Sequence, residues 1–533
     1  MSKIKKAFAI LLSMAMILGM SLTVFANDDT SKTEASVKGL ESDRLTVTAY
    51  QIISYDEAGY YEPVLPDSIT TDGKTEDNQH DILTPTADDV QKLAARTDEL
   101  TTTVTEWSKT EKQDETYTYS SNALTAGTWM IIVSGSEKYL YNPAIISVNV
   151  TADGTEYGTL NLVTDSWDHE LYPKRSEPTI TKTAEKADTK DTEVVGVQHG
   201  DIIKFTVTSD IPDYSSDVTS IDTYIISDQL DGLSLVKNDQ YPVTVTVDGA
   251  EDISAIKNTI INAVMDGEST FSAVLSEADT FLLANGGKQI VITYYAKVTS
   301  IDKINVDELN NTAKLEYSTR DKTITKDDST KHYTFGFDTG FNGSFTSDNK
   351  TGEFFKIDEK GNVNYEEKNS GKVTVTSPLF GAKFELRIGS KTGEVFGTYT
   401  TDSDGRLEVN GLDPDVTYYL VETKAPSGYT LNTTPIKVEI EADFTGDTLT
   451  GYDVIFNDGK TTATTHYGYE EGETIIINTE DTPSNPYGFK NTTLNNLPST
   501  GGMGTTIFTI GGCVIMIAAA GLYFASRRRQ ESK

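Results

Sequence analysis

The chain has 533 residues, of which 81 are acidic and 45 basic, and its formal net charge at pH 7 is −36. This acidity argues against nucleic acid as a partner, because phosphate binding needs clustered lysine and arginine. The single cysteine, Cys513, lies in an apolar stretch near the C-terminus, so any covalent cross-link before it must use other side chains.

The first 26 residues are typical of a secretory signal peptide. Three lysines within the first six residues precede an apolar run, and Ala26 provides the small residue expected at the cleavage position. An uncleaved membrane anchor is the alternative, but it does not need this cleavage pattern. We therefore expect residues 1–26 to be removed on export.

Short runs of alternating apolar and polar residues dominate the chain after the signal peptide. Examples are 45–50, 241–247 and 289–298, and clusters of Asp, Asn, Gly and Ser separate such runs. This spacing is typical of β-sandwiches. Helical periodicity is confined to two short stretches, 88–100 and 253–265. We predict an all-β protein built from β-sandwich domains in tandem.

The exported part is long enough for about three domains of ordinary size. A segment rich in Gly, Asp and Asn separates the last of them from the others and is typical of a linker or long loop. The predicted boundaries are 27–172 for an N-terminal domain, 173–332 for a middle domain, 333–351 for the linker or loop, and 352–491 for a C-terminal domain.

Three features follow one another at the C-terminal end. The pentapeptide Leu497-Pro498-Ser499-Thr500-Gly501 comes first, then the apolar run 507–525, then a basic tail, 526–533, with three consecutive arginines. A run of about 19 apolar residues is just long enough to cross a ~30 Å hydrocarbon core as a helix. Because the basic tail stays on the cytoplasmic side, the pentapeptide lies outside the membrane, where an enzyme can cut it.

This order resembles the cell-wall sorting signal of Gram-positive surface proteins, LPxTG followed by a helix and a basic tail. The resemblance implies that a sortase cuts the Thr500–Gly501 bond through an acyl-enzyme intermediate and joins Thr500 to an amine. It also implies attachment to peptidoglycan on the surface of a Gram-positive bacterium, after transient anchoring in the membrane.

The tripeptide Tyr172-Pro173-Lys174 lies at the first predicted domain boundary. Pro173 has a fixed φ and no N–H, so the segment cannot belong to a central strand, and we expect the Lys174 amine to be accessible. By itself this describes an ordinary surface lysine. Its core and its place in the chain resemble the pilin motif of sortase-assembled pili, although the preceding residues match only in part. The resemblance implies that Lys174 is the acceptor amine for Thr500 of the next subunit.

A long motif lies in the predicted C-terminal domain. Residues 418–429 read YYLVETKAPSGY and fit the E-box of Cna B-type immunoglobulin-like domains. In a strand, Glu422 has the same parity as the apolar Tyr418 and Leu420, so we predict that it points inward, where a charged carboxyl is costly to bury. The resemblance implies that Glu422 serves as the proton shuttle for a spontaneous lysine–asparagine isopeptide bond, formed without an enzyme or cofactor.

The same resemblance places the lysine on the first strand of this domain and the asparagine on the last. Lys356 fits the first position. Asn491 is the preferred asparagine, and Asn478 is the alternative because it follows a more apolar strand. The sequence leaves this choice open.

Shorter motifs in the predicted middle domain resemble Cna A-type pilin domains. Lys182 opens a strand, Asp228 lies in a segment like the one that carries a catalytic aspartate, and Asn311 lies in a segment like their closing strand. The resemblance implies a second isopeptide bond, between Lys182 and Asn311, with Asp228 as the proton shuttle. Without the resemblance, Asp228 is a cap before a β-turn. We find no corresponding trio in 27–172.

Taken over nearly the whole chain, the resemblance implies the major shaft subunit of a sortase-assembled pilus. Its expected partners are further copies of the chain, pilin-class and housekeeping sortases, minor pilins, peptidoglycan and host surface ligands. The alternative is a wall-anchored adhesin, or a minor pilin at the tip or base, which would not need Lys174. Asp402 begins a stretch like a calcium loop, but the glutamate expected at the twelfth position is absent. We expect no metal, no cofactor and no enzyme beyond the autocatalytic bonds.

Overall fold

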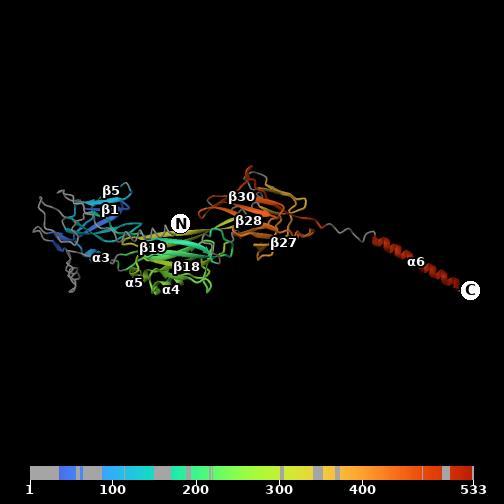
Figure 1. Cartoon of the computed structure of the whole chain (residues 1–533), viewed down its shortest axis with the longest axis horizontal. Helices are drawn as coiled ribbons and strands as arrows, with labels where there is room; N and C mark the ends of the chain where they lie inside the picture. Colours follow the sequence, from blue (N-terminus) through green and yellow to red (C-terminus); the bar gives the residue numbers. More distant parts are fainter. Residues whose placement is uncertain are drawn as a thin grey trace. The chain divides into compact units, whose positions relative to one another are not determined.

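The computed structural model describes residues 35–55, 61–63, 87–112, 114–125, 127–148, 170–187, 194–214, 218, 220–300, 305–339, 352–365, 372–470, 472–494 and 504–530. The predicted signal peptide and the sorting pentapeptide, with Thr500 and Gly501, lie outside these ranges. Strands dominate the described residues, and α6 (Gly504–Gln530) is the one long helix among them (Figure 1). The prediction of an all-β chain with an apolar C-terminal helix is confirmed.

Contacts divide the chain into two compact units. Unit 1 contains Met1–Thr192, Ile202–Lys297 and Asn311–Thr330, and unit 2 contains Glu193–Asp201, Val298–Asn310 and Lys331–Lys533. Unit 1 thus holds strands from the first two predicted domains, whereas three short segments predicted for the middle domain, 193–201, 298–310 and 331–332, belong to unit 2. The division into three domains stays a prediction.

The N-terminal strands of unit 1 form two sheets, with strand orders β10-β1-β6-β5 and β3-β2-β7-β9, and β4 pairs with β2. A separate pair, β8 and β11, follows. The bounds are β1 (Ala35–Leu40), β2 (Thr46–Tyr55), β3 (Tyr61–Pro63), α3 (Ala87–Ala94), η1 (Thr97–Glu99), β4 (Thr103–Val104), β5 (Ser108–Glu111), β6 (Tyr117–Ser121), β7 (Gly127–Ser134), β8 (Leu140–Tyr141), β9 (Ala144–Val148), β10 (Glu170–Leu171) and β11 (Arg175–Ser176).

Two further sheets carry the middle of the chain. One has the order β12-β13-β18-β15, with β16 also on β18, and in the other β14 pairs with both β17 and β19. Every second residue of β13 and β18 is buried, as expected where one face of a sheet covers a core. The bounds are β12 (Ile180–Lys186), β13 (Ile202–Asp210), β14 (Tyr224–Leu230), β15 (Leu233–Val236), β16 (Thr244–Val247), α4 (Ser254–Ala263), β17 (Thr270–Val274), η2 (Ser276–Ala278), α5 (Asp279–Ala284), β18 (Gln289–Val298), β19 (Val306–Ser318) and β20 (Thr323–Phe337).

Unit 2 contains a seven-stranded sheet in the order β25-β24-β27-β28-β29-β30-β31, and two smaller pairs, β21 with β32 and β22 with β23. Phe354, Phe384 and Phe489 pack against one another in its buried core. The bounds are β21 (Phe354–Asp358), β22 (Val363–Tyr365), β23 (Val373–Val375), β24 (Lys383–Ile388), β25 (Val395–Thr400), β26 (Val409–Leu412), β27 (Tyr418–Lys424), β28 (Ile436–Thr445), β29 (Thr448–Asn457), β30 (Thr462–Glu470), β31 (Glu473–Ile477) and β32 (Tyr487–Asn491).

The beginning of the predicted linker is a strand. Residues 333–337 form the end of β20, so the prediction of a loop is wrong for them. Tyr333, Phe335 and Phe337 recur at every second position and are buried in the core of unit 2. This period-two pattern was present in the sequence, but the Gly, Asp and Asn content of the residues that follow concealed it.

The helices agree with the sequence pattern. Helices α3 and η1 lie within the predicted stretch 88–100, except that α3 begins one residue earlier. Helix α4 lies within the predicted stretch 253–265. α5 was not predicted because six residues are too few to show a helical period. Residues Phe508–Arg527 of α6 are long and apolar enough to cross a membrane, which matches the predicted span 507–525.

Candidate functional site

Three strands of unit 2 bring a lysine, a glutamate and an asparagine together. β21 carries Lys356, β27 carries Glu422 and β32 carries Asn491. β21 and β32 are parallel neighbours, with Lys356 opposite Phe489. All three polar residues are at most 2% exposed. The inward direction predicted for Glu422 from strand parity is confirmed, since Tyr418 and Leu420 are buried beside it in β27.

The three side chains contact one another directly. Lys356 Nζ donates to Asn491 Oδ1 at 2.6 Å and lies 3.8 Å from Glu422 Oε1. Asn491 Nδ2 donates to both oxygens of the Glu422 carboxyl, at 2.9 and 3.1 Å. The Asn432 N–H donates to Glu422 Oε2 at 2.8 Å. The Asn491 amide is thus held with an amine on its carbonyl side and a carboxyl on its nitrogen side.

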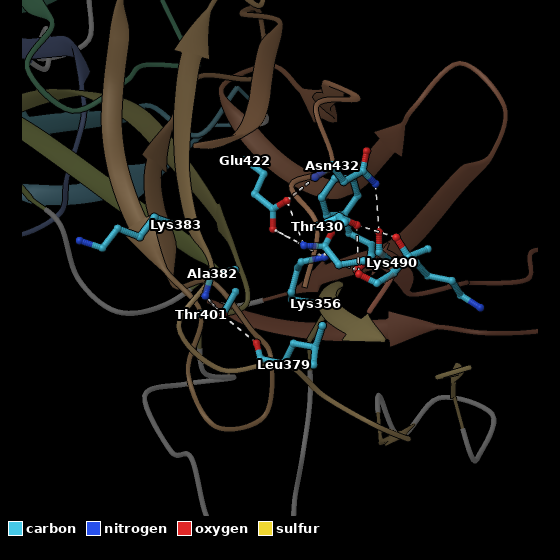
Figure 2. A network of polar contacts seen from close by, with 12 residues as sticks. Lys356, Leu379, Ala382, Lys383, Thr401, Glu422, Thr430, Asn432 and Lys490 are labelled. Carbon is cyan, nitrogen blue, oxygen red and sulfur yellow. Dashed lines mark hydrogen bonds and ion pairs between the residues drawn. The ribbon is translucent and has the colours of Figure 1, made fainter. Parts of the chain in front are cut away.

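Other lysines of these strands are directed elsewhere. Figure 2 shows the side chains of Lys356 and Glu422 directed toward one another, whereas Lys383 and Lys490 point away from them. Lys383 and Lys490 are exposed, and Lys356 is fully buried. Of these three lysines, Lys356 on the first strand is therefore the one whose amine contacts the Asn491 amide.

Burial changes the chemistry of the Lys356 amine. Desolvation lowers its pKa from 10.5 to about 8, against the opposing charge of Glu422. Nζ also lies 4.4 Å from the centre of the Phe489 ring. A substantial fraction of this amine is therefore neutral near pH 8, and only the neutral form is a nucleophile.

The structure separates the two candidate asparagines. Asn478 follows β31 directly, and its Oδ1 accepts a hydrogen bond from the Ser484 N–H at 3.2 Å. Asn491, on the strand next to β21, lies beside the Lys356 amine. The more apolar strand before Asn478 was a misleading signal, because strand pairing and not local hydropathy determines which asparagine faces the lysine.

A second cluster of buried polar side chains lies in unit 1, where residues of two sheets meet. Lys182 (β12) and Tyr294 (β18) come from one sheet, and Asp228 (β14) and Asn311 (β19) come from the other. Each of these side chains is at most 6% exposed. The structure therefore brings the three predicted residues together and adds a tyrosine to them.

Tyr294 connects the other three residues. Its hydroxyl accepts from Lys182 Nζ at 2.5 Å and from Asn311 Nδ2 at 3.0 Å, and it donates to Asp228 Oδ2 at 2.7 Å. Lys182 Nζ also donates to Asp228 Oδ2. Within the part of the chain that the structure describes, Asp228 Oδ1 and Asn311 Oδ1 are buried without a hydrogen-bond partner.

Desolvation shifts the pKa of each titratable member toward its neutral form. It lowers the pKa of Lys182 from 10.5 to about 8 and raises the pKa of Asp228. It also raises the pKa of Tyr294 well above its usual value, so the hydroxyl keeps its proton. Burial thus makes the neutral forms of the amine, the acid and the phenol more accessible here than in water.

Sequence reasoning missed Tyr294. The available signal was its parity, because the residues at positions 290, 292, 294 and 296 of β18 are all buried. A tyrosine at a fully buried strand position needs a partner for its hydroxyl. Parity distinguishes Tyr294 from its neighbour Tyr295, but nothing in the sequence says that this face of β18 meets Lys182.

Lys174 lies on the surface between β10 and β11, and its side chain is exposed. Tyr172, two residues earlier, is 68% exposed. The Lys174 carbonyl accepts a hydrogen bond from the Asn142 N–H at 2.9 Å. This placement agrees with the prediction that Lys174 lies outside a central strand with an accessible amine.

Asp402 stands in a tight turn. Its Oδ1 accepts hydrogen bonds from the N–H groups of Asp404 and Arg406, each at 2.9 Å, and its Oδ2 pairs with the Arg406 side chain at 3.2 Å. Among the described residues, no group of three or more His, Cys, Asp or Glu side chains is placed to hold a metal ion.

Two sequence families match parts of this chain. Residues 369–452, which include the E-box, match the prealbumin-like fold domain of the SpaA family. Residues 490–533 match the LPXTG cell wall anchor motif of Gram-positive bacteria. These matches define the class: a surface protein anchored to the cell wall through an LPXTG motif, for which sortase is the attaching enzyme and peptidoglycan the attachment site.

Within this class the chain is similar to backbone pilins. The trypsin-resistant surface T6 protein of Streptococcus pyogenes serotype M6 is 24% identical over 488 residues, which cover 77% of this chain and 81% of that protein. The solved three-domain structure of the T6 backbone pilin matches with a TM-score of 0.51 and 18% identity, over 89% of this chain and all of that one. The major pilin SpaD of Corynebacterium diphtheriae matches with a TM-score of 0.41 and 16% identity, over 89% of this chain and 100% of that one. The resemblance to pilins is confirmed for the fold.

Proposed function

We propose that this chain is the shaft subunit of a covalently polymerised cell-surface pilus. The observation that carries the proposal is that one chain has both an acceptor amine and a donor motif. The amine is the exposed Lys174 in a Tyr-Pro-Lys segment, and the donor is the LPSTG pentapeptide within the matched anchor motif. A subunit with both groups can be joined to a further subunit at each of them. The similarity to the T6 backbone pilin supports the same assignment.

The joining reaction needs a partner enzyme. A pilin-class sortase supplies a cysteine thiolate, which attacks the Thr500 carbonyl, and the Gly501 end leaves with its amine. The neutral Lys174 amine of the next subunit then attacks the thioester, an amide forms, and the thiolate leaves. A housekeeping sortase transfers the completed fibre to peptidoglycan, and minor pilins and host ligands are its further partners. The chain itself is a substrate in these steps and not an enzyme.

Replacing Lys174 with alanine tests the proposal. In cells that express the chain with its sortase, Lys174→Ala is expected to abolish the high-mass covalent ladder on a denaturing gel, because the acceptor amine is gone. Lys257→Ala, a substitution of another exposed lysine on α4, is the matched control and is expected to leave the ladder intact. A ladder that survives Lys174→Ala would leave the wall-anchored adhesin or minor pilin as the better assignment.

We further propose that each buried cluster forms an isopeptide bond within the chain. In unit 2, the neutral Lys356 amine attacks the Asn491 side-chain carbonyl carbon. The Nζ–Cγ bond forms, the Cγ–Nδ2 bond breaks and ammonia leaves. The Glu422 carboxyl takes a proton from the attacking amine and passes one to the departing nitrogen, which it already contacts.

The cluster of unit 1 supports the same chemistry with one more residue in the path. Lys182 is the nucleophile and Asn311 loses ammonia. Tyr294 stands between Asp228 and the Asn311 nitrogen, so a proton passes from the acid to the leaving group through the tyrosine hydroxyl. Asp228 and Tyr294 together do what Glu422 does alone.

This relay predicts a selective defect. Tyr294→Phe removes the hydroxyl but keeps the ring, and we expect the Lys182–Asn311 bond to form about 10²–10⁴-fold more slowly, which is the range that general acid–base catalysis contributes. The Lys356–Asn491 bond serves as an internal control and should form normally. Intact mass at successive times after synthesis counts the bonds formed, and peptide mapping at the same times tells which of the two has formed. Normal cross-linking of unit 1 in Tyr294→Phe would remove the tyrosine from the mechanism.

A further inference from the structure

The backbone on both sides of Lys174 is tied to other strands. Before the lysine, β10 pairs in parallel with β1. After it, β11 pairs with β8, with Arg175 opposite Tyr141. Together with the hydrogen bond from Asn142 to the Lys174 carbonyl, these pairings hold the main chain at the lysine, while its side chain stays exposed.

Side-chain contacts reinforce this attachment directly after Lys174. Arg175 Nη1 donates to the Gly39 carbonyl at 2.9 Å and to the Tyr141 hydroxyl at 3.2 Å. The Tyr141 hydroxyl donates to Glu41 Oε2, and Ser136 Oγ donates to Glu41 Oε1 at 2.5 Å. We call Glu41, Ser136, Tyr141 and Arg175 the Arg175 clamp.

Part of the Arg175 clamp is buried and part of it is exposed. Tyr141 and Ser136 are 7% and 4% exposed, whereas Arg175 is exposed. Burial, with the hydrogen bond to Glu41, raises the pKa of Tyr141, so its hydroxyl remains a donor. The Arg175 guanidinium lies 4.0 Å from the centre of the Tyr139 ring, a cation–π contact that fixes its plane.

Residues that precede and follow Lys174 in the sequence both lie against Gly39. Its carbonyl accepts from Arg175, and a Cβ at Gly39 would lie 3.4 Å from Cδ1 of the Tyr172 ring. Gly39 has a φ of +73°, a conformation that glycine adopts without strain. The residues two before and one after Lys174 therefore converge on the same point of β1.

We propose that the Arg175 clamp positions the Lys174 amine for acyl transfer, an inference that rests on the proposed function. The amine must reach a thioester carbonyl held by a separate enzyme. If the main chain at Lys174 is already fixed, less freedom is lost when the sortase docks, and more of the docked complexes reach attack geometry. Clamp residues act through Lys174 and are positioning residues.

Conjugation kinetics with the full exported chain, a purified pilin-class sortase and a synthetic LPSTG peptide test the proposal. Arg175→Ala and Tyr141→Phe are expected to lower kcat about tenfold, with less than about a twofold change in KM for the acceptor, because positioning is lost and docking surface is kept. Arg175→Lys keeps a donor at the same place and should recover part of the loss. Amide hydrogen exchange across 170–176 should become faster in the variants that lose kcat.

Tyr119→Phe is the matched control. It removes a tyrosine hydroxyl from the same part of unit 1, where Tyr119 donates to the carbonyls of Ser42 and Leu45. This control should keep kcat and the exchange of 170–176. Unchanged kcat in Arg175→Ala would overturn the proposal, and so would an equal loss in Tyr119→Phe. Undiminished conjugation of Lys174→Ala would instead refute the proposed function itself.

Discussion

The exported chain, produced without its sorting signal, is expected to weigh less than its sequence by the mass of two ammonia molecules. Each proposed isopeptide bond releases one ammonia, and no disulfide contributes, because Cys513 lies in the removed segment. Intact mass spectrometry measures the loss. Peptide mapping should find one branched peptide that joins Lys182 to Asn311 and another that joins Lys356 to Asn491.

Asparagine variants make this result specific. Asn491→Ala should restore the mass of one ammonia, after correction for the substitution, because the carbonyl beside Lys356 is gone. Asn478→Ala, the matched control, should keep both losses, since Asn478 binds the Ser484 N–H. A chain with the mass of its unmodified sequence would refute both bonds, and a loss restored by Asn478→Ala would refute the pairing in unit 2.

The second large effect concerns the stability of unit 2. Lys356 and Asn491 are 135 positions apart, and closing a loop of this length covalently contributes roughly 5 kcal/mol through the entropy of the unfolded chain. Glu422→Ala should prevent the bond and lower the melting temperature of unit 2 by about 10–20 °C, at roughly 2–4 °C per kcal/mol for a unit of this size. Differential scanning calorimetry measures the shift, and hydrogen exchange assigns it to unit 2.

The control for stability is another glutamate of the same sheet. Glu441 is exposed on β28, so Glu441→Ala should change the free energy of unfolding by less than about 0.5 kcal/mol. The mass of each variant must be measured on the same sample. If Glu422→Ala lacks the bond and its unit 2 still has the melting temperature of the unsubstituted chain, the cross-link does not stabilise unit 2 in the way proposed.

Local patterns in the sequence identified much of the candidate site. Strand parity predicted that Glu422 faces inward, and the structure buries it with Tyr418 and Leu420. The direction of Glu422 could be predicted because a strand alternates its side chains between two faces, so local order alone tells which residues share a face. Lys356 and Lys182 were assigned through the resemblance to Cna B-type and Cna A-type domains, and the structure buries both side chains.

Other features depend on which strands become neighbours, and no local pattern encodes that. The pairing of β21 with β32 distinguishes Asn491 from Asn478, and the packing of two sheets puts Tyr294 between Lys182 and Asn311. The contact of Arg175 with Gly39 joins residues 136 positions apart. By itself the sequence determined the strands, their buried faces and the order of the reactive segments. Only the tertiary structure decided which buried groups touch, because contacts between distant strands follow from sheet pairing and packing across the whole chain.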